Sequence, residues 1–195
     1  MTVSIVLTGL SGSGKTSVGQ ALAERLGCTF VDTDSLIEAD FGSPIAEIFS
    51  DKGEPFFRDL ETKVLEKLAS EASETTGKER DSVVSTGGGA VISAHNRRLL
   101  RQLGKVVYLT APVKVLAARL SGDMTRPLLN SNDRQLSNDD RSTEMANLIL
   151  KLENLLNARK DAYMEADLTV ETEAEAAHDI ADKILSLLNL ETNRL

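Results

Sequence analysis

A phosphate-binding loop near the start of the chain constrains the fold more than any other stretch. Residues 9–16, Gly-Leu-Ser-Gly-Ser-Gly-Lys-Thr, match the pattern G-x-x-x-x-G-K-[ST]. A β-branched apolar run, residues 3–8, precedes the loop, and helical periodicity follows it. In such a loop, backbone N–H groups and the dipole of the following helix bind phosphate oxygens. We therefore expect a bound nucleotide to contact Gly12, Ser13, Gly14, Lys15, Thr16 and Ser17.

Strand-like and helix-like segments alternate along the rest of the chain. Short apolar strands are predicted at 29–32, 82–85, 105–110 and 168–170, with helices at 15–26, 55–69, 93–103, 112–120, 144–166 and 174–188. A polar surface loop is predicted at 70–81. This alternation indicates an α/β fold with a parallel sheet covered by helices on both faces. With 195 residues, one domain spanning 1–195 is expected.

Composition excludes several classes of function. The net charge is −8 and the isoelectric point is near 4.9, which argues against a general nucleic-acid surface. We also expect no membrane segment, because no apolar stretch approaches the ~18 residues that a span requires. A single cysteine, Cys28, and the lack of a leader-like N-terminus indicate a cytoplasmic protein. No long exposed apolar stripe is evident, so a monomer is expected.

An acidic motif and a glycine-rich motif each follow a predicted strand. Asp32 and Asp34 come at the end of the second strand, and Gly87, Gly88 and Gly89 end the third. The carboxyl ends of parallel strands meet at one sheet edge, so both motifs should lie beside the phosphate loop. One carboxylate could hold Mg²⁺ together with Thr16, and the other could orient a hydroxyl nucleophile. A solvated strand end or a helix cap is the alternative interpretation of the acidic pair.

The glycines and the arginines also have alternative interpretations. Three adjacent glycines suit a close backbone approach to a ligand, or simply a tight turn. Arg58 follows two phenylalanines and could pair with a carboxylate ligand, or with Asp59 or Glu61 on its own helix. A polar stretch at about 121–143 is typical of a mobile lid, and Arg126 lies within it.

Taken together, these motifs resemble the shikimate kinase family of the nucleoside-monophosphate-kinase-like fold. The resemblance runs from Gly9 to Val170 and includes, in order, the phosphate loop, Asp-Thr-Asp at 32–34, Phe57-Arg58, the triple glycine, Arg126-Pro-Leu-Leu and Arg159-x-x-x-Tyr163. It implies a three-layer fold with a five-stranded parallel sheet of order 2-3-1-4-5 and a lid. It also implies transfer of the γ-phosphoryl group of ATP to the 3-hydroxyl of shikimate, in the pathway to aromatic amino acids.

The resemblance assigns roles to particular residues. Lys15, Asp34 and Arg126 are the implied catalytic residues, and Asp34 is the candidate base. Thr16 and Asp32 are implied at Mg²⁺, while Arg119 and Arg126 join the phosphate loop in binding ATP. The implied shikimate contacts are Asp34, Arg58, Gly87, Gly88, Gly89 and Arg159. Arg134 and Arg141 are further candidates for lid contacts, within a polar insertion around 130–144.

Three other functions remain open from the residues alone. The same fold could phosphorylate another small hydroxy acid such as gluconate, or a nucleoside monophosphate. A non-catalytic module whose lid is set by ATP is the third alternative, although such a module would have no need of Asp34.

Overall fold

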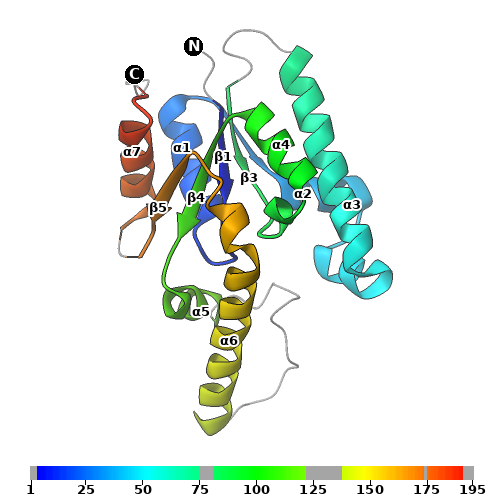
Figure 1. Cartoon of the computed structure of the whole chain (residues 1–195), viewed down its shortest axis with the longest axis vertical. Coiled ribbons are helices and arrows are strands. Elements are labelled where there is room, and N and C mark those ends of the chain that lie inside the picture. The colour runs from blue at the N-terminus through cyan, green and yellow to red at the C-terminus, as the bar shows by residue number, and fades with distance from the viewer. Residues whose placement is uncertain (1–3, 75–80, 122–137, 174, 191–195) are drawn as a thin grey trace.

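A five-stranded parallel sheet forms the centre of the computed structural model, which describes residues 4–74, 81–121, 138–173 and 175–190 (Figure 1). The strand order is β2-β3-β1-β4-β5. This order confirms the predicted topology. The strands are β1 (Ser4–Thr8), β2 (Thr29–Asp32), β3 (Ser82–Ser85), β4 (Lys105–Thr110) and β5 (Leu168–Glu171).

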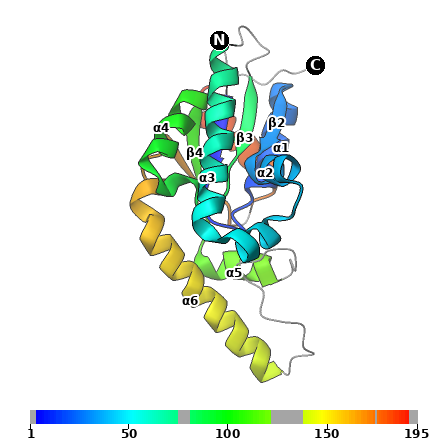
Figure 2. The same ribbon diagram turned by 90° about the vertical axis from the view of Figure 1, so that its right-hand side faces the viewer.

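Helices cover both faces of this sheet. The pair α1 and α7 packs on one face, and α3 and α4 lie on the other (Figures 1 and 2). Most of α6 extends beyond the sheet, and this helix packs beside α5. The bounds are α1 Lys15–Leu26, α2 Thr33–Phe41, α3 Ile45–Glu74, α4 Ala94–Leu103, α5 Val113–Ser121, α6 Asn138–Tyr163 and α7 Ala177–Leu187, with a short 3₁₀ turn, η2, at Ala90–Ile92.

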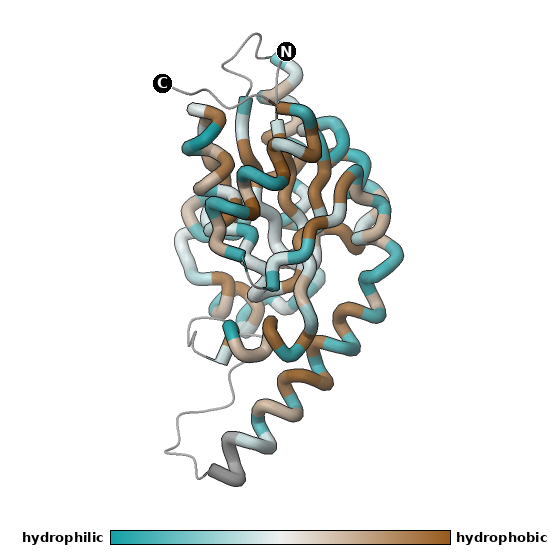
Figure 3. The backbone as a smooth tube through the Cα atoms, turned by 90° about the vertical axis from the view of Figure 1, so that its left-hand side faces the viewer, coloured by the Kyte–Doolittle hydropathy of each residue, from teal (hydrophilic) through white to brown (hydrophobic). Residues whose placement is uncertain are grey.

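Alternate residues of the central strand enter two different cores. Ile5 and Leu7 of β1 join the core beneath α1 and α7, whereas Val6 points into the core beneath α3, α4 and α6. The middle residues of β1, β3 and β4 are accordingly apolar and buried. Figure 3 shows hydrophobic stretches of the backbone gathered in the interior of the molecule. In the observed register, Leu7 of β1 lies beside Ser85 of β3 and Val107 of β4, so the phosphate loop leaves the sheet near the carboxyl ends of both neighbouring strands.

Several element boundaries differ from the sequence-based prediction. Helix α2 begins at Thr33, directly after β2, where the sequence suggested a strand end. Helix α3 continues to Glu74, so the first five residues of the loop predicted at 70–81 are helical. A kink at Gly53 (φ 80°, ψ 170°) divides this helix near its start. Helix α6 begins at Asn138, six residues before the predicted start.

The predicted lid at 121–143 falls largely outside the described residues. Its first residue ends α5, and its last six begin α6. Within the described segments, no helix combines the length and the hydrophobicity that crossing a bilayer requires.

Candidate active site

The phosphate loop connects β1 to α1 at the carboxyl edge of the sheet. Gly12 and Gly14 have φ angles of 83° and 89°, which a residue with a side chain rarely adopts. Gly14 precedes the first residue of α1, so the loop ends at a helix N-terminus. Lys15 lies back over the loop, and its Nζ donates to the carbonyl oxygens of Gly9 (2.9 Å) and Leu10 (3.0 Å). The lysine is buried, and these two bonds hold its ammonium group against the loop.

Asp32 has two partners at the junction of β2 and α2. Its Oδ2 accepts from the Thr16 hydroxyl at 3.3 Å, and its Oδ1 accepts from the backbone N–H groups of Asp34 (3.1 Å) and Ser35 (3.4 Å). Asp32 is therefore the N-cap of α2 as well as a neighbour of the phosphate loop. A hydroxyl and a carboxylate side by side next to a phosphate site suit Mg²⁺, which takes one or two protein oxygens and completes its shell with phosphates and water.

Asp34 occupies the first turn of α2. Because Thr33 is also in this helix, its hydroxyl reaches the turn after β3 and accepts from the backbone N–H of Gly87 at 3.2 Å. This bond joins the start of α2 to the triple glycine and places the Asp34 carboxylate against the same turn.

Each of the three glycines after β3 lies against a different part of the site. A Cβ atom on Gly87 would lie 2.5 Å from Glu61 Oε1 and 2.7 Å from Asp34 Oδ1. On Gly89 it would overlap the guanidinium group of Arg58. On Gly88 it would meet the phosphate loop, 3.3 Å from the Gly9 carbonyl oxygen. The triple glycine is thus a close-packed junction, and the tight-turn interpretation alone does not account for it.

Arg58 contacts two carboxylates of its own helix. Its Nη1 donates to Glu61 Oε2 at 2.5 Å, while its Nη2 and Nε donate to Glu54 Oε1 at 2.8 and 3.2 Å. Burial acts to lower the pKa of Arg58, but the two carboxylates outweigh it and raise that pKa. Burial raises the pKa of Glu61, whose side chain is 2% exposed, and Arg58 only partly offsets this effect. Arg58 is therefore a fixed cation at the wall of the site.

Arg159 and Tyr163 reach the triple glycine from the last turns of α6. The Tyr163 hydroxyl and the Arg159 Nη1 both donate to the carbonyl oxygen of Gly88, at 2.5 Å and 3.1 Å. This contact brings a second arginine to the site from a segment about 100 residues away from Arg58.

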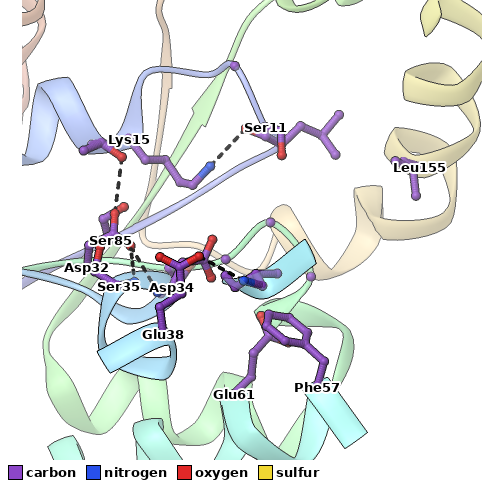
Figure 4. A pocket seen from close by; sticks show the side chains of 18 of the residues that line it. Ser11, Lys15, Asp32, Asp34, Ser35, Glu38, Phe57, Glu61, Ser85 and Leu155 are labelled. Atoms are coloured by element: carbon purple, nitrogen blue, oxygen red, sulfur yellow. Dashed lines mark hydrogen bonds between the residues drawn. The ribbon is translucent and has the colours of Figure 1, made fainter. Parts of the chain in front are cut away.

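The phosphate loop, the acidic residues Asp32, Asp34 and Glu61, the triple glycine and the two arginines line one cleft with a volume of about 590 Å³. Figure 4 shows Lys15, Asp32, Asp34 and Glu61 around this space, with Leu155 of α6 on its other side. The predicted site residues that line the cleft are Gly12, Gly14, Lys15, Thr16, Ser17, Asp32, Asp34, Arg58, Gly87, Gly88, Gly89 and Arg159. Phosphate-binding, acidic and cationic groups thus share a single space.

Three predicted residues are not placed on the wall of this cleft. Ser13 is fully buried beneath the loop. Arg119 bonds instead to backbone, with its Nη1 donating to the Gly12 carbonyl at 3.2 Å and its Nη2 donating to the carbonyls of Thr172 and Glu173. It therefore ties the phosphate loop to the chain beyond β5. Arg126, like Arg134, lies outside the described residues, and the side chain of Arg141 does too.

Comparison with known proteins identifies the family. The shikimate kinase family model matches residues 11–189. A shikimate kinase from Geobacter sulfurreducens is 41% identical over 184 residues, which cover 94% of this chain and 90% of that protein. The chain belongs to the shikimate kinase family. A second shikimate kinase, from Caldicellulosiruptor bescii, is 38% identical over 183 residues, 94% of each chain.

A solved structure from the shikimate kinase family has the same fold. Shikimate kinase from Acinetobacter baumannii, in complex with shikimate, superposes with a TM-score of 0.80 at 42% identity, over 97% of this chain and 94% of that one. The match spans the sheet, the phosphate loop and the helices that carry the arginines.

Sequence reasoning missed part of this shikimate kinase site. Glu54 was not anticipated, and Glu61 was considered only as a partner for Arg58. Their spacing offered a signal, because residues four before and three after Arg58 share its helix face. The apolar wall formed by Phe49, Leu152 and Leu155 had no local signal, since it combines one residue of α3 with two of α6, about 100 positions later in the chain.

Proposed function

We propose that this protein transfers the γ-phosphoryl group of ATP to the 3-hydroxyl of shikimate, giving shikimate 3-phosphate and ADP. One observation carries the proposal: the phosphate loop and the arginines Arg58 and Arg159 open onto the same cleft, with Asp34 on its wall. An anionic acceptor held by two arginines would therefore lie next to the transferable phosphate. The cytoplasmic location and the monomeric state remain predictions from the sequence.

The acceptor is held by charge and by shape. Arg58 and Arg159 provide planar donors for a carboxylate, and such pairs are stronger than neutral hydrogen bonds. Phe49, Phe57 and Leu155 give the cleft an apolar wall against which a carbocyclic ring can pack. An acidic protein can thereby select a small anion, because two cations line the same cleft.

Asp34 takes the proton of the acceptor hydroxyl in this mechanism. The hydroxyl oxygen forms a bond to the γ-phosphorus as the bond to the bridging oxygen of ADP breaks, and the hydroxyl proton passes to the Asp34 carboxylate. Lys15 stabilises the charge on the phosphates. Thr16 and Asp32 would hold Mg²⁺, which supplies further neutralisation of phosphate charge when bound. Arg126 stays a predicted lid contact to the phosphates.

ADP release from Mg²⁺–ATP, with and without shikimate, tests the proposal. We expect turnover that depends on shikimate. A panel of sugar acids, gluconate included, should not support turnover in its place. Replacing Asp34 by Asn should lower kcat by about 10²- to 10⁴-fold, because the general base is lost. ATP affinity, measured by calorimetry, should stay within about two-fold, since Asp34 does not hold the phosphates.

Two results would contradict the proposal. Turnover without any response to shikimate would point to another acceptor. ATP binding without ADP release in the presence of shikimate would favour the non-catalytic module. Full activity of the Asp34→Asn variant would remove Asp34 from the mechanism while leaving the reaction in place.

A further inference from the structure

The carbonyl oxygen of Gly88 receives two side-chain donors from α6. The Tyr163 hydroxyl lies 2.5 Å from it, and Arg159 Nη1 lies 3.1 Å from it. A carbonyl oxygen has two lone pairs, so both bonds can form at once. Gly88 also packs beside the phosphate loop, because a Cβ atom there would lie 3.3 Å from the Gly9 carbonyl oxygen, so the position of Gly88 matters to both halves of the site.

The two donors differ in how firmly they are held. Tyr163 is 1% exposed, and its ring stacks on Tyr108 of β4 with the centroids 4.7 Å apart and the planes 2° from parallel. Arg159 is only half-buried and lines the cleft. Burial raises the pKa of Tyr163 to about 12, so its hydroxyl stays a donor throughout the neutral range. The tyrosine is a fixed donor, whereas the arginine has access to the acceptor.

An arginine that binds a carboxylate must direct its N–H groups towards it. If Arg159 were the only donor to Gly88, turning it towards an acceptor would leave a partly buried carbonyl without a partner. That loss opposes binding, because an unsatisfied polar group away from water is destabilising. With Tyr163 in place, the carbonyl keeps one donor in either orientation of the arginine.

We propose that Tyr163 is a positioning residue, which holds the Gly88 carbonyl and so leaves Arg159 available to bind the acceptor carboxylate. This inference rests on the proposed function, since it assumes a carboxylate-bearing acceptor. It assigns to Tyr163 a role in the affinity for the acceptor carboxylate, apart from the affinity for nucleotide and from the stability of the fold.

Replacement of Tyr163 by Phe removes the hydroxyl and keeps the stacked ring. We expect the dissociation constant of shikimate, measured by calorimetry without nucleotide, to rise by about 3- to 10-fold. The dissociation constant of ATP should change by less than about two-fold. Tyr108→Phe is the matched control, because it removes one hydroxyl from the partner ring of the same stack, and both affinities should stay near those of the wild type.

A double-mutant cycle with Arg159→Met separates positioning from a general structural effect. If Tyr163 acts through Arg159, the variant with both substitutions should bind shikimate no more weakly than Arg159→Met alone. Independent losses that multiply in the double variant would overturn the inference. Equal shikimate affinity of Tyr163→Phe and wild type would overturn it as well.

The same titrations distinguish this inference from the proposed function. Wild-type protein that binds ATP but not shikimate would overturn the proposed acceptor, and with it the role of Tyr163 in acid binding. Wild-type protein that binds shikimate, together with an unaffected Tyr163→Phe variant, would overturn only the role of Tyr163.

Discussion

At the scale of single residues, the triple glycine is the most crowded point of the site. Gly87 faces two carboxylates, Gly88 faces the phosphate loop and Gly89 faces a guanidinium group. The sequence indicated that these glycines were functional, but it could not show that three neighbours serve three different contacts. That division depends on α2, α3 and the phosphate loop converging from separate parts of the chain.

Replacement of Gly89 by Ala should weaken acid binding selectively. The added Cβ would overlap the guanidinium group of Arg58, which must then move away from its place on the wall. Because the loss of one charged hydrogen-bonding partner amounts to about 1.5–3 kcal/mol, shikimate affinity should fall by roughly 10- to 100-fold. ATP affinity should be retained, and calorimetric titration of both ligands measures the difference.

Gly42→Ala is the control for this variant. Gly42 has a φ of 80° but no heavy atom within 4 Å of its missing Cβ, so the change strains the backbone without touching the site. We expect it to destabilise the fold by about 1–2 kcal/mol with shikimate affinity unchanged. If Gly89→Ala bound shikimate as well as this control does, Arg58 would not need its observed position.

At the scale of elements, the sequence predicted the strands better than the helix ends. Each strand is a short run with an apolar centre between polar turns, and the alternation with helices predicted a parallel sheet, whereas the strand order followed only from the resemblance to the shikimate kinase family. Helix α2 was missed because Asp32-Thr33-Asp34 suited both a strand end and a helix cap. The structure uses Asp32 as the cap, which was the alternative interpretation. The tertiary contact of Thr33 with Gly87, which supports that choice, is not visible in the local pattern.

Asp32 therefore combines a structural and a proposed metal-binding role, which two substitutions can separate. Asn at position 32 can still cap α2, so Asp32→Asn should unfold within about 1–2 °C of the wild type. Asp32→Ala loses the cap and should be about 1 kcal/mol less stable. Both variants lack the carboxylate beside Thr16, so both should need several-fold more Mg²⁺ for half-maximal turnover. A Mg²⁺ requirement unchanged in Asp32→Asn would argue against Asp32 at the metal.

At the scale of the whole molecule, α6 ties the site to the fold. Its last turns bring Arg159 and Tyr163 to the edge of the sheet, while its earlier turns extend past α5 (Figure 2). Periodicity predicted a helix here, but an isolated pattern could not indicate that its end reaches Gly88. Arg159 was implied by the resemblance, which includes an Arg-x-x-x-Tyr motif, and the structure brings both residues of that motif to one carbonyl.

Tyr163 should also make the folded state sensitive to alkali. Burial raises its pKa from the usual 10.0 to about 12 in the folded protein, so folding favours the protonated phenol. The stabilising contribution is complete below pH 10 and is lost as the pH rises towards 12. Between these limits the wild type should lose on the order of 2 kcal/mol more than Tyr163→Phe. Urea unfolding followed by far-ultraviolet circular dichroism at both pH values measures this difference, and parallel losses in the two proteins would contradict it.

The stacked tyrosine pair has a consequence for how this protein can be observed. The chain has two tyrosines and no tryptophan, and both tyrosines are in that stack. Tyrosine fluorescence and the tyrosine band of the near-ultraviolet circular dichroism spectrum therefore both come from this stack. One of its two hydroxyl groups, that of Tyr163, donates to the carbonyl oxygen of Gly88. We therefore expect a ligand that displaces Arg159 or Gly88 to change the tyrosine signal, which would report binding without any attached dye.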